Sequence, residues 1–286
     1  MLAAGVVLGG MYALVAMGLT LQYGVARIMN LAYGECLVAA CFAALWFFTA
    51  ANVAPPLALL VVVPAAFAGN WLLYRVFLRP LVRRAPNAGA LAADSILATF
   101  GLLFVIQGLM LAAFGGSYQS YSWLSLPVTF AGTTITANRL LALGLAAVLG
   151  LGLWVLLTRT RAGTAVRAVA VNPAAAPLVG INVERVAALA FALGGAVVAA
   201  GGVLVSTFLT FSAGVGVLFT MKALVVVIMG GVGNLLGCLI AGLLLGLTET
   251  VVAARVDPGL TLAATYALFL LVLVLRPAGL FGRPAR

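Results

Sequence analysis

Residues 3–23 read AAGVVLGGMYALVAMGLTLQY, a run without a charged side chain. A helix needs roughly 20 mostly apolar residues to cross the hydrocarbon core of a bilayer, and this run has that length. Similar runs recur near residues 35–52, 56–78, 94–114, 139–158, 186–210, 217–232, 235–254 and 259–275. The sequence therefore predicts an all-α, polytopic transmembrane helix bundle with eight or nine membrane segments, forming a single domain over residues 1–286.

The run near 217–232 has two interpretations. It is short, and it leads directly into Gly230-Gly231-Val232-Gly233-Asn234. It is either a further crossing or one arm of a re-entrant hairpin, and the sequence alone leaves both open.

The composition excludes several classes of protein. Of 286 residues, 65% are apolar and 7% are charged, whereas soluble domains are about 45–50% apolar and about 25% charged. The chain has no histidine, and Cys36, Cys41 and Cys238 lie in apolar runs without a C-x-x-C spacing. We therefore expect neither a metal, a cofactor nor a disulfide framework, and no enzyme active site.

The basic residues predict the orientation of the bundle. With the N-terminus outside, twelve of the fifteen lysines and arginines fall in inner segments, which predicts a cytoplasmic C-terminus in the inner membrane of a bacterium. Only Arg139 and Arg255 fall outside, and Lys222 lies within a span. The inner residues are Arg27, Arg75, Arg79, Arg83, Arg84, Arg159, Arg161, Arg167, Arg185, Arg276, Arg283 and Arg286.

The inner connection over residues 159–185 is mildly apolar and rich in alanine, which is unusual for a simple linker. Its pattern predicts two short helices: Asn172 suits a cap, Pro173 a first helical position and Gly180 the left-handed residue beyond the end. So short a helix is unstable alone, so we expect it to dock on another surface. Its apolar face would consist of Ala175, Leu178, Val179 and Ile181.

This connection resembles the coupling loop of the branched-chain amino acid ABC permeases, the segment that rests in a groove of the ATPase subunit. The residues that carry the resemblance are Gly163, Arg167, Ala168, Ala175, Leu178, Gly180 and Ile181. Further matches are Asn30-Leu31-Ala32-Tyr33-Gly34-Glu35, the glycine-rich run at 230–234 and the tail from Arg276 to Pro284. Together the matches cover essentially the full length.

The resemblance implies a transport subunit for branched-chain amino acids. It further implies two ABC ATPase subunits, a second related permease and an extracytoplasmic solute-binding protein as partners. No G-x-x-x-x-G-K-[ST] loop occurs in this chain, so ATP hydrolysis would belong to those partners. The family commonly has histidine in place of Tyr33 and serine in place of Asn234. Similar permeases import urea, short amides or other small polar solutes, so the cargo stays open.

Charged residues inside spans are costly and indicate a functional or a structural role. Lys222 and Glu249 are predicted to lie at the same depth, roughly 8 Å from the outer ends of their spans. Either they meet the carboxylate and the ammonium of an amino acid in transit, or they form an interhelical ion pair. Asn30 and Tyr33, with neighbouring Glu35, are predicted to lie at the cytoplasmic end of the first helix pair, either as a capped helix start or as part of an inner gate. We place Asn30, Tyr33 and Asn234 near the pathway as well.

Two functions of other classes were weighed. A secondary transporter driven by an ion gradient usually has paired acids or broken helices at the membrane midplane, and Lys222 and Glu249 lie off-centre. An intramembrane enzyme would need a nucleophile with its base, or metal ligands, and the absence of histidine argues against both.

Overall fold

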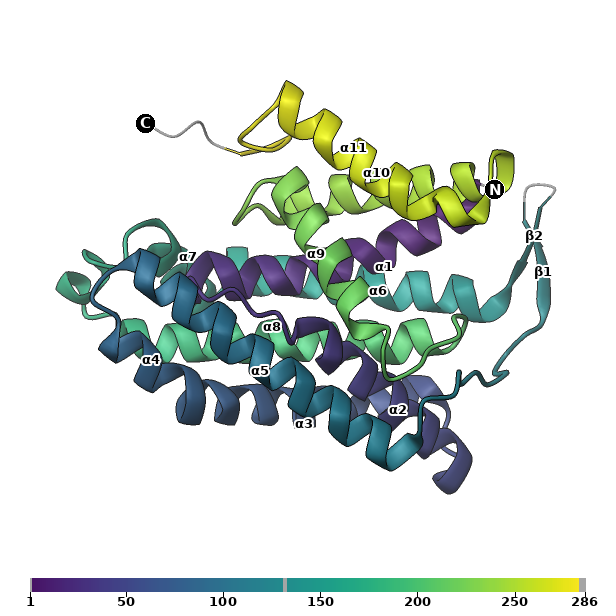
Figure 1. Cartoon of the computed structure of the whole chain (residues 1–286), viewed down its shortest axis with the longest axis horizontal. Coiled ribbons are helices and arrows are strands. Elements are labelled where there is room, and N and C mark those ends of the chain that lie inside the picture. Colours follow the sequence, from purple (N-terminus) through teal and green to yellow (C-terminus); the bar gives the residue numbers. More distant parts are fainter. Residues whose placement is uncertain (1, 131–132, 283–286) are drawn as a thin grey trace.

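The computed structural model describes residues 2–130 and 133–282. Figure 1 shows long helices running roughly side by side along the longest axis of the molecule. The first half contains α1 (Leu2–Leu21), the π-helical turn η1 (Gln22–Ala26), α2 (Tyr33–Ala51), α3 (Pro55–Leu73), the π-helical turn η2 (Tyr74–Leu78), α4 (Arg79–Arg84) and α5 (Ala88–Phe114). The second half contains β1 (Pro127–Phe130), β2 (Thr133–Thr136), α6 (Ala137–Arg159), α7 (Arg161–Val171), η3 (Ala176–Val179), α8 (Val183–Ser206), α9 (Gly216–Gly230), α10 (Leu235–Arg255), η4 (Pro258–Leu260) and α11 (Thr261–Leu275).

The number of membrane helices agrees with the sequence prediction. Within the described residues, eight helical segments are long and apolar enough to cross a membrane. Helix α9 has 15 residues, which span about 22 Å and are too short for the roughly 30 Å hydrocarbon core. The chain is therefore a multi-pass membrane protein, and α9 is shorter than a full crossing.

The two ends of the bundle differ in charge. Helix α1 begins near β1 and β2 at one end of the bundle, and α4 and α7 lie at the opposite end, as Figure 1 shows. The end that carries α4, α7 and the start of α8 is called the arginine-rich end, because Arg79, Arg83, Arg159 and Arg161 belong to these elements or border them. The opposite end carries the β1–β2 hairpin and is called the hairpin end. Arg283 and Arg286 lie outside the described residues.

Glycines bring α1 and α10 into close contact. A Cβ added at Gly9 would meet the backbone of Leu243, and one added at Gly246 would collide with the backbone of Gly9. Small residues four apart let helix backbones approach in lipid, where no hydrophobic effect drives helices together. The small-residue spacings at Gly5/Gly9 and Gly242/Gly246 therefore form the α1–α10 interface.

The hairpin was not expected from the sequence. Strands β1 and β2 pair antiparallel, with Pro127 opposite Thr136 and Val128 opposite Ile135. A chain crossing between helices at a water-exposed end must satisfy its own backbone groups, and two β-branched runs do so by pairing. The loop between α5 and α6 therefore has regular structure in place of a simple turn.

Candidate functional site

The segment that precedes α2 lies inside the bundle. Residues 27–32 are not helical, and they lead from the end of η1 back to the start of α2, which lies partway along the bundle (Figure 1). Ile28, Asn30 and Ala32 are all almost fully buried. Irregular backbone at membrane depth is tolerated only where protein or a water-filled cavity surrounds it. Neighbouring side chains must therefore satisfy the polar groups of this segment.

Two threonines from distant helices contact the segment. The Oγ1 atom of Thr99 in α5 accepts a 3.1 Å hydrogen bond from the Leu31 N–H and lies 3.0 Å from the carbonyl oxygen of Met29. Thr220 in α9 accepts a 2.8 Å bond from the Gly34 N–H, and its Oγ1 lies 3.2 Å from the carbonyl oxygen of Leu31. These contacts join α2, α5 and α9 at one point inside the bundle.

Asn30 also serves this segment. Its Oδ1 accepts from the Ala32 N–H at 3.1 Å, and its Nδ2 donates to Gln22 Oε1 at 3.1 Å. Gln22 in turn donates from Nε2 to the carbonyl oxygen of Phe191 in α8 at 2.9 Å. Asn30 is thus one link in a buried chain of amides that fixes the approach to α2.

Tyr33 is fully buried at the first position of α2. Its hydroxyl donates to the carbonyl oxygen of Val15 in α1 at 2.7 Å, and it lies 3.4 Å from the carbonyl oxygen of Gly194 in α8. The ring therefore spans from α2 to two long helices. With Asn30 and Glu35, it lies where the start of α2 meets the start of α9, a place called the joint below. The joint lies partway along the bundle, and not at the cytoplasmic end expected from sequence.

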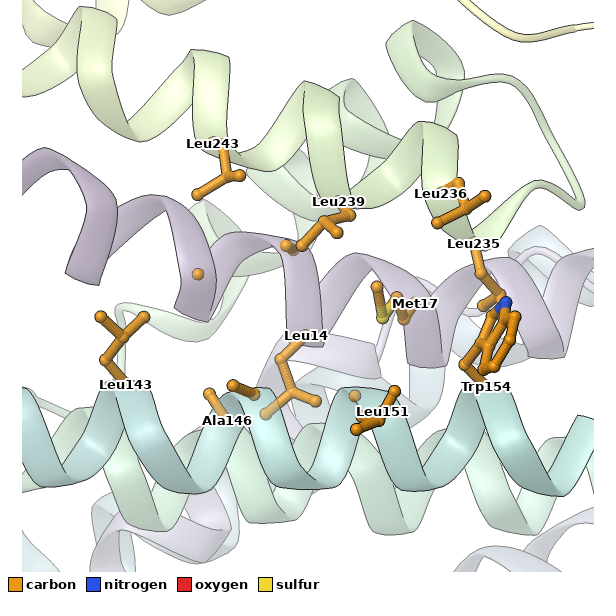
Figure 2. A pocket seen from close by; sticks show the side chains of 14 residues that line it. Leu14, Met17, Leu143, Ala146, Leu151, Trp154, Leu235, Leu236, Leu239 and Leu243 are labelled. Atoms are coloured by element: carbon orange, nitrogen blue, oxygen red, sulfur yellow. The ribbon is translucent and has the colours of Figure 1, made fainter.

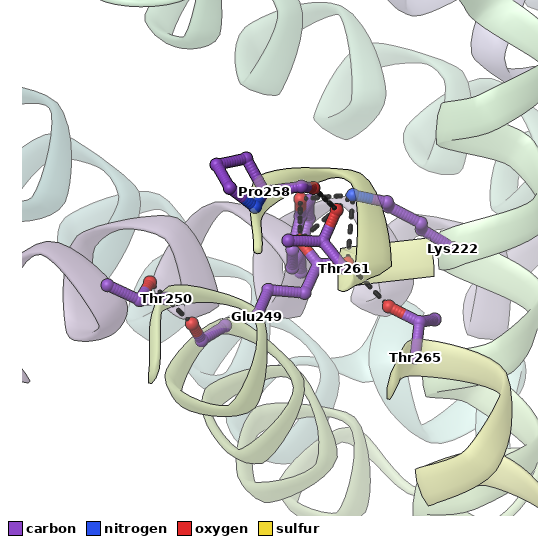
Figure 3. Close-up of polar contacts among 8 residues, drawn as sticks. Lys222, Glu249, Thr250, Pro258, Thr261 and Thr265 are labelled. Atoms are coloured by element: carbon purple, nitrogen blue, oxygen red, sulfur yellow. Dashed lines mark hydrogen bonds and ion pairs between the residues drawn. The ribbon is translucent and has the colours of Figure 1, made fainter. Parts of the chain in front are cut away.

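Lys222 and Glu249 meet directly, as Figure 3 shows. The Lys222 Nζ lies 2.9 Å from each carboxylate oxygen of Glu249. Tyr12 of α1 accepts a 2.7 Å bond from that ammonium and donates to Glu249 at 2.8 Å. Thr265 of α11 donates to the other carboxylate oxygen at 2.6 Å. Four helices therefore converge on one buried ion pair.

This cluster is fully partnered within the chain. Both oxygens of Glu249 accept hydrogen bonds, and only 5% of its side chain is exposed, against 18% for Lys222. A buried ion pair is tolerable only when its remaining donors and acceptors are satisfied in this way. The geometry matches the interhelical ion pair, one of the two alternatives that the sequence left open.

The connection from α6 to α8 forms two short helices, as predicted. Helix α7 is capped by Thr160, whose side chain accepts from the Gly163 N–H, and Asn172 Oδ1 accepts from the N–H groups of Ala174 and Ala175. The second helix, η3, is a single 3₁₀ turn that ends at Gly180, with φ 78°. Gly180 therefore ends the second helix as predicted, whereas Pro173 lies in the turn before that helix and not at its first position.

The predicted coupling residues divide into an anchored and an exposed group. Gly163 is buried against α6, where a Cβ would collide with the backbone of Leu156 and Leu157. Leu178 and Val179, by contrast, are 87% and 74% exposed. The other predicted coupling residues are exposed or half-buried: Arg167, Ala168, Ala175, Gly180 and Ile181.

Asn234 caps α10. Its Oδ1 accepts from the Gly237 N–H at 3.1 Å, and its Nδ2 donates to the carbonyl oxygen of Phe281 at 3.2 Å. The adjacent Leu280 N–H donates to Met229 at the end of α9. Asn234 thus binds the C-terminal tail to the α9–α10 turn, apart from the joint at Tyr33, and its predicted place on the pathway stays a prediction.

Two hollows differ sharply in chemistry. An apolar groove of about 510 Å³ lies between α1, α6 and α10, with leucine side chains along it and Trp154 at one end (Figure 2). A zwitterion would find no polar partner there, so this groove suits lipid chains. A second hollow of about 490 Å³ at the hairpin end is lined by polar groups, namely hydroxyl and amide side chains such as Ser120, Tyr121 and Asn138, and the guanidinium of Arg139.

Hydrogen bonds hold in place the side chains that line the polar hollow. Tyr121 and Ser206 share a 2.8 Å hydrogen bond, and Asn138 Nδ2 donates to the carbonyl oxygen of Thr207 at 2.8 Å. Burial raises the pKa of the Tyr121 hydroxyl to about 12, although the hydrogen bond to Ser206 opposes that shift. The hydroxyl therefore stays protonated at neutral pH and keeps its contact with α8.

Sequence reasoning missed Thr99, Thr220 and Gln22. Threonine in a membrane helix usually bonds to the backbone of its own helix, so its presence gives no signal of a longer contact. Gln22 lies at the end of an apolar run, where a polar residue is expected in any case. Only the return of the chain into the bundle shows what these three side chains do.

Comparison with known proteins gives consistent matches over the chain. Residues 1–275 match the family model described as "Branched-chain amino acid transport system / permease component". The high-affinity branched-chain amino acid transport system permease protein LivH of Salmonella typhimurium is 30% identical over 98% of this chain and 94% of its own length. LivH of Escherichia coli K12 is also 30% identical, with the same coverage.

A more distant bacterial relative matches over a similar length. The permease protein BraD of Pseudomonas aeruginosa is 28% identical over 99% of this chain and 95% of its own length. No solved structure matches this chain.

Proposed function

Because this chain belongs to the family of permease components of branched-chain amino acid transport systems, we propose that it forms, with a second related permease, the translocation pathway of an ABC importer. Two ATPase subunits drive the importer, and an extracytoplasmic solute-binding protein delivers branched-chain amino acids to it. The chain is a transport subunit without catalytic chemistry of its own, and in this proposal it resides in a bacterial inner membrane with its C-terminus cytoplasmic.

The exposed aliphatic surface at η3 carries this proposal. Leu178 and Val179 project from a short segment bordered by Arg161, Arg167 and Arg185. These charges keep the segment at the membrane surface, facing water, where contiguous exposed apolar side chains indicate a protein interface. A groove in an ATPase subunit would cover them, and buried Gly163 would pass the resulting force to α6.

The polar hollow at the hairpin end supports the opposite half of the proposal. Its hydroxyl and amide lining lies at the end predicted to face outward, where a binding protein would release a zwitterion. Released solute would then move toward the joint of α2 and α9. ATP binding would draw the ATPase subunits together, move α7 and η3, and rock the helices around that joint.

Two alternatives to an ABC importer of branched-chain amino acids make different predictions. Urea, amides or another small polar solute would use the same architecture, because the substitutions at Tyr33 and Asn234 leave the cargo open. A carrier driven by an ion gradient would need a charged pair free to change partners, whereas Lys222 and Glu249 have all their partners inside the bundle. We therefore favour the ABC importer.

Uptake into proteoliposomes tests the proposal. The chain is reconstituted with its co-purifying subunits, and labelled leucine is offered with and without internal ATP and external binding protein. We expect uptake that requires both. Uptake of urea or amides without leucine would retain the mechanism and change the cargo, and uptake driven by an ion gradient with this chain alone would refute the importer.

A further inference from the structure

Glu35 is a buried carboxylate that has no hydrogen-bond partner in the described part of the chain. It lies in the first turn of α2 and has no exposed surface. Among residues 2–130 and 133–282, neither carboxylate oxygen finds a hydrogen-bond partner. An ionised carboxylate needs donors, and a protonated one needs an acceptor for its own O–H, so either form lacks its contact. Glu249, the other almost fully buried acid, has every contact that Glu35 lacks.

The carboxylate of Glu35 lies at the contact between α2 and α9. A Cβ at Gly216 would collide with both carboxylate oxygens, so the carboxylate lies directly against the first residue of α9. The start of α2 lies against the same turn, joined to it by the bond from the Gly34 N–H to Thr220. Two helix N-termini therefore meet at Glu35 inside the bundle.

The chemistry of the site favours an ammonium group over a metal ion. Hard metal ions require about six oxygen ligands, and among the described residues no cluster of acids, cysteines or histidines could hold one. An ammonium carries three N–H donors, and two acceptors at an anionic carboxylate match it well. Branched-chain amino acids carry such a group beside an apolar side chain. The buried residues of α2 and α9 are mostly apolar, which suits such a side chain.

We propose that Glu35, at the joint between α2 and α9, binds the ammonium group of the amino acid in transit. This inference rests on the proposed function, since it names where that function holds its cargo. In the conformation described, the carboxylate is closed off, so solute reaches it when α2 and α9 move apart. In the described residues, the bond from the Gly34 N–H to Thr220 is the only side-chain hydrogen bond between α2 and α9, so few directional contacts oppose their separation.

Substitution with the matching amide tests the proposal. Glu35→Gln keeps the size of the side chain and removes its charge, and Asp94→Asn makes the same change at an exposed acid in α5. We expect Glu35→Gln to lower ATP-dependent leucine uptake about tenfold or more, as loss of a charge-assisted hydrogen bond predicts, and Asp94→Asn to leave it unchanged. Equal uptake by Glu35→Gln and the unchanged complex would refute the proposal.

A second measurement is independent of uptake. Dicyclohexylcarbodiimide modifies carboxyl groups inside membranes, and mass spectrometry of the unchanged complex gives the rate at Glu35. We expect leucine to slow this modification, whereas 4-methylpentanoate, which has the leucine side chain without the amine, does not. Equal protection by both compounds, or protection by neither, would refute an ammonium site.

The two experiments also separate this inference from the proposed function. If the unchanged complex takes up no branched-chain amino acid, the proposed function fails, whatever the labelling shows. If uptake occurs but Glu35→Gln matches it while co-purifying normally with its partners, the function stands and the ammonium site falls. A Glu35→Gln chain that fails to assemble is judged by the protection of the unchanged complex.

Discussion

At the scale of single residues, the two buried glutamates have opposite surroundings. Glu249 accepts from Tyr12, Thr265 and Lys222, all from different helices, whereas Glu35 accepts from no described residue. Desolvating a charge is costly. The hydrogen bonds and counter-charge of Glu249 offset that cost, whereas no described residue offsets it at Glu35. These surroundings support the proposal that Glu35 contacts the cargo, and they match an interhelical ion pair at Glu249.

Lys222→Met should destabilise the protein strongly. It leaves the Glu249 carboxylate buried without its counter-charge, and breaking a buried pair in this way costs about 3–5 kcal/mol. The double variant Lys222→Met with Glu249→Gln removes both charges and should recover much of that loss. Thermal unfolding of the single and double variants in detergent measures the coupling between the two residues.

The same double variant decides the pathway role of the pair. Normal leucine uptake in membranes with normal assembly would remove Lys222 and Glu249 from the pathway. A loss of uptake with full stability would place them on it, as the alternative reading from sequence holds.

At the scale of helices, glycine determines how closely α1 and α10 approach. Gly246→Ala should destabilise the protein, because the added Cβ collides with the backbone of Gly9, which cannot move aside as a flexible side chain could. Gly144→Ala in α6 is the control, since nothing lies within 4 Å of its Cβ position. Unfolding temperatures should fall for Gly246→Ala only, and equal values would contradict a close helix contact.

The short helix η3 should carry the contact with the ATPase. Leu178→Ser removes the most exposed aliphatic side chain of the segment, so we expect less ATPase subunit to co-purify and uptake to fall. Ala174→Ser, in the turn that Asn172 caps, is the control because it adds a hydroxyl to an exposed position without removing apolar area. Full co-purification with Leu178→Ser would place the contact elsewhere.

At the scale of the whole molecule, the orientation of the bundle is open to a direct test. The excess of arginine at the end carrying α4 and α7 predicts that this end faces the cytoplasm. Ser122→Cys at the hairpin end should react with a membrane-impermeant thiol reagent in intact cells, and Ala174→Cys only after permeabilisation. Cys41 and Cys238 are buried and Cys36 is half-buried, which keeps the background low. The reverse pattern would invert the topology.

Much of the fold could be predicted from sequence because hydrophobicity adds up locally. The run at residues 3–23 needs no knowledge of its neighbours to identify it as a membrane helix, and the same holds for Asn172 and Gly180 as signals at helix ends. The hairpin over 127–136 escaped prediction because its strands are short. The position of the start of α2 inside the bundle was not predicted, because an apolar run shows how long a helix is and not where along the bundle it begins.

The sequence by itself determined the membrane class, the long apolar helices and the helical connection over residues 159–185, since each depends on residues close together in the chain. Only the tertiary structure decided that Lys222 meets Glu249 and Tyr12, that Thr99 and Thr220 satisfy the segment before α2, and that Glu35 has no hydrogen-bond partner among the residues described. Those facts depend on residues up to 210 positions apart. Their contacts exist only once the helices have packed, and local propensity carries no record of which side chains then face one another.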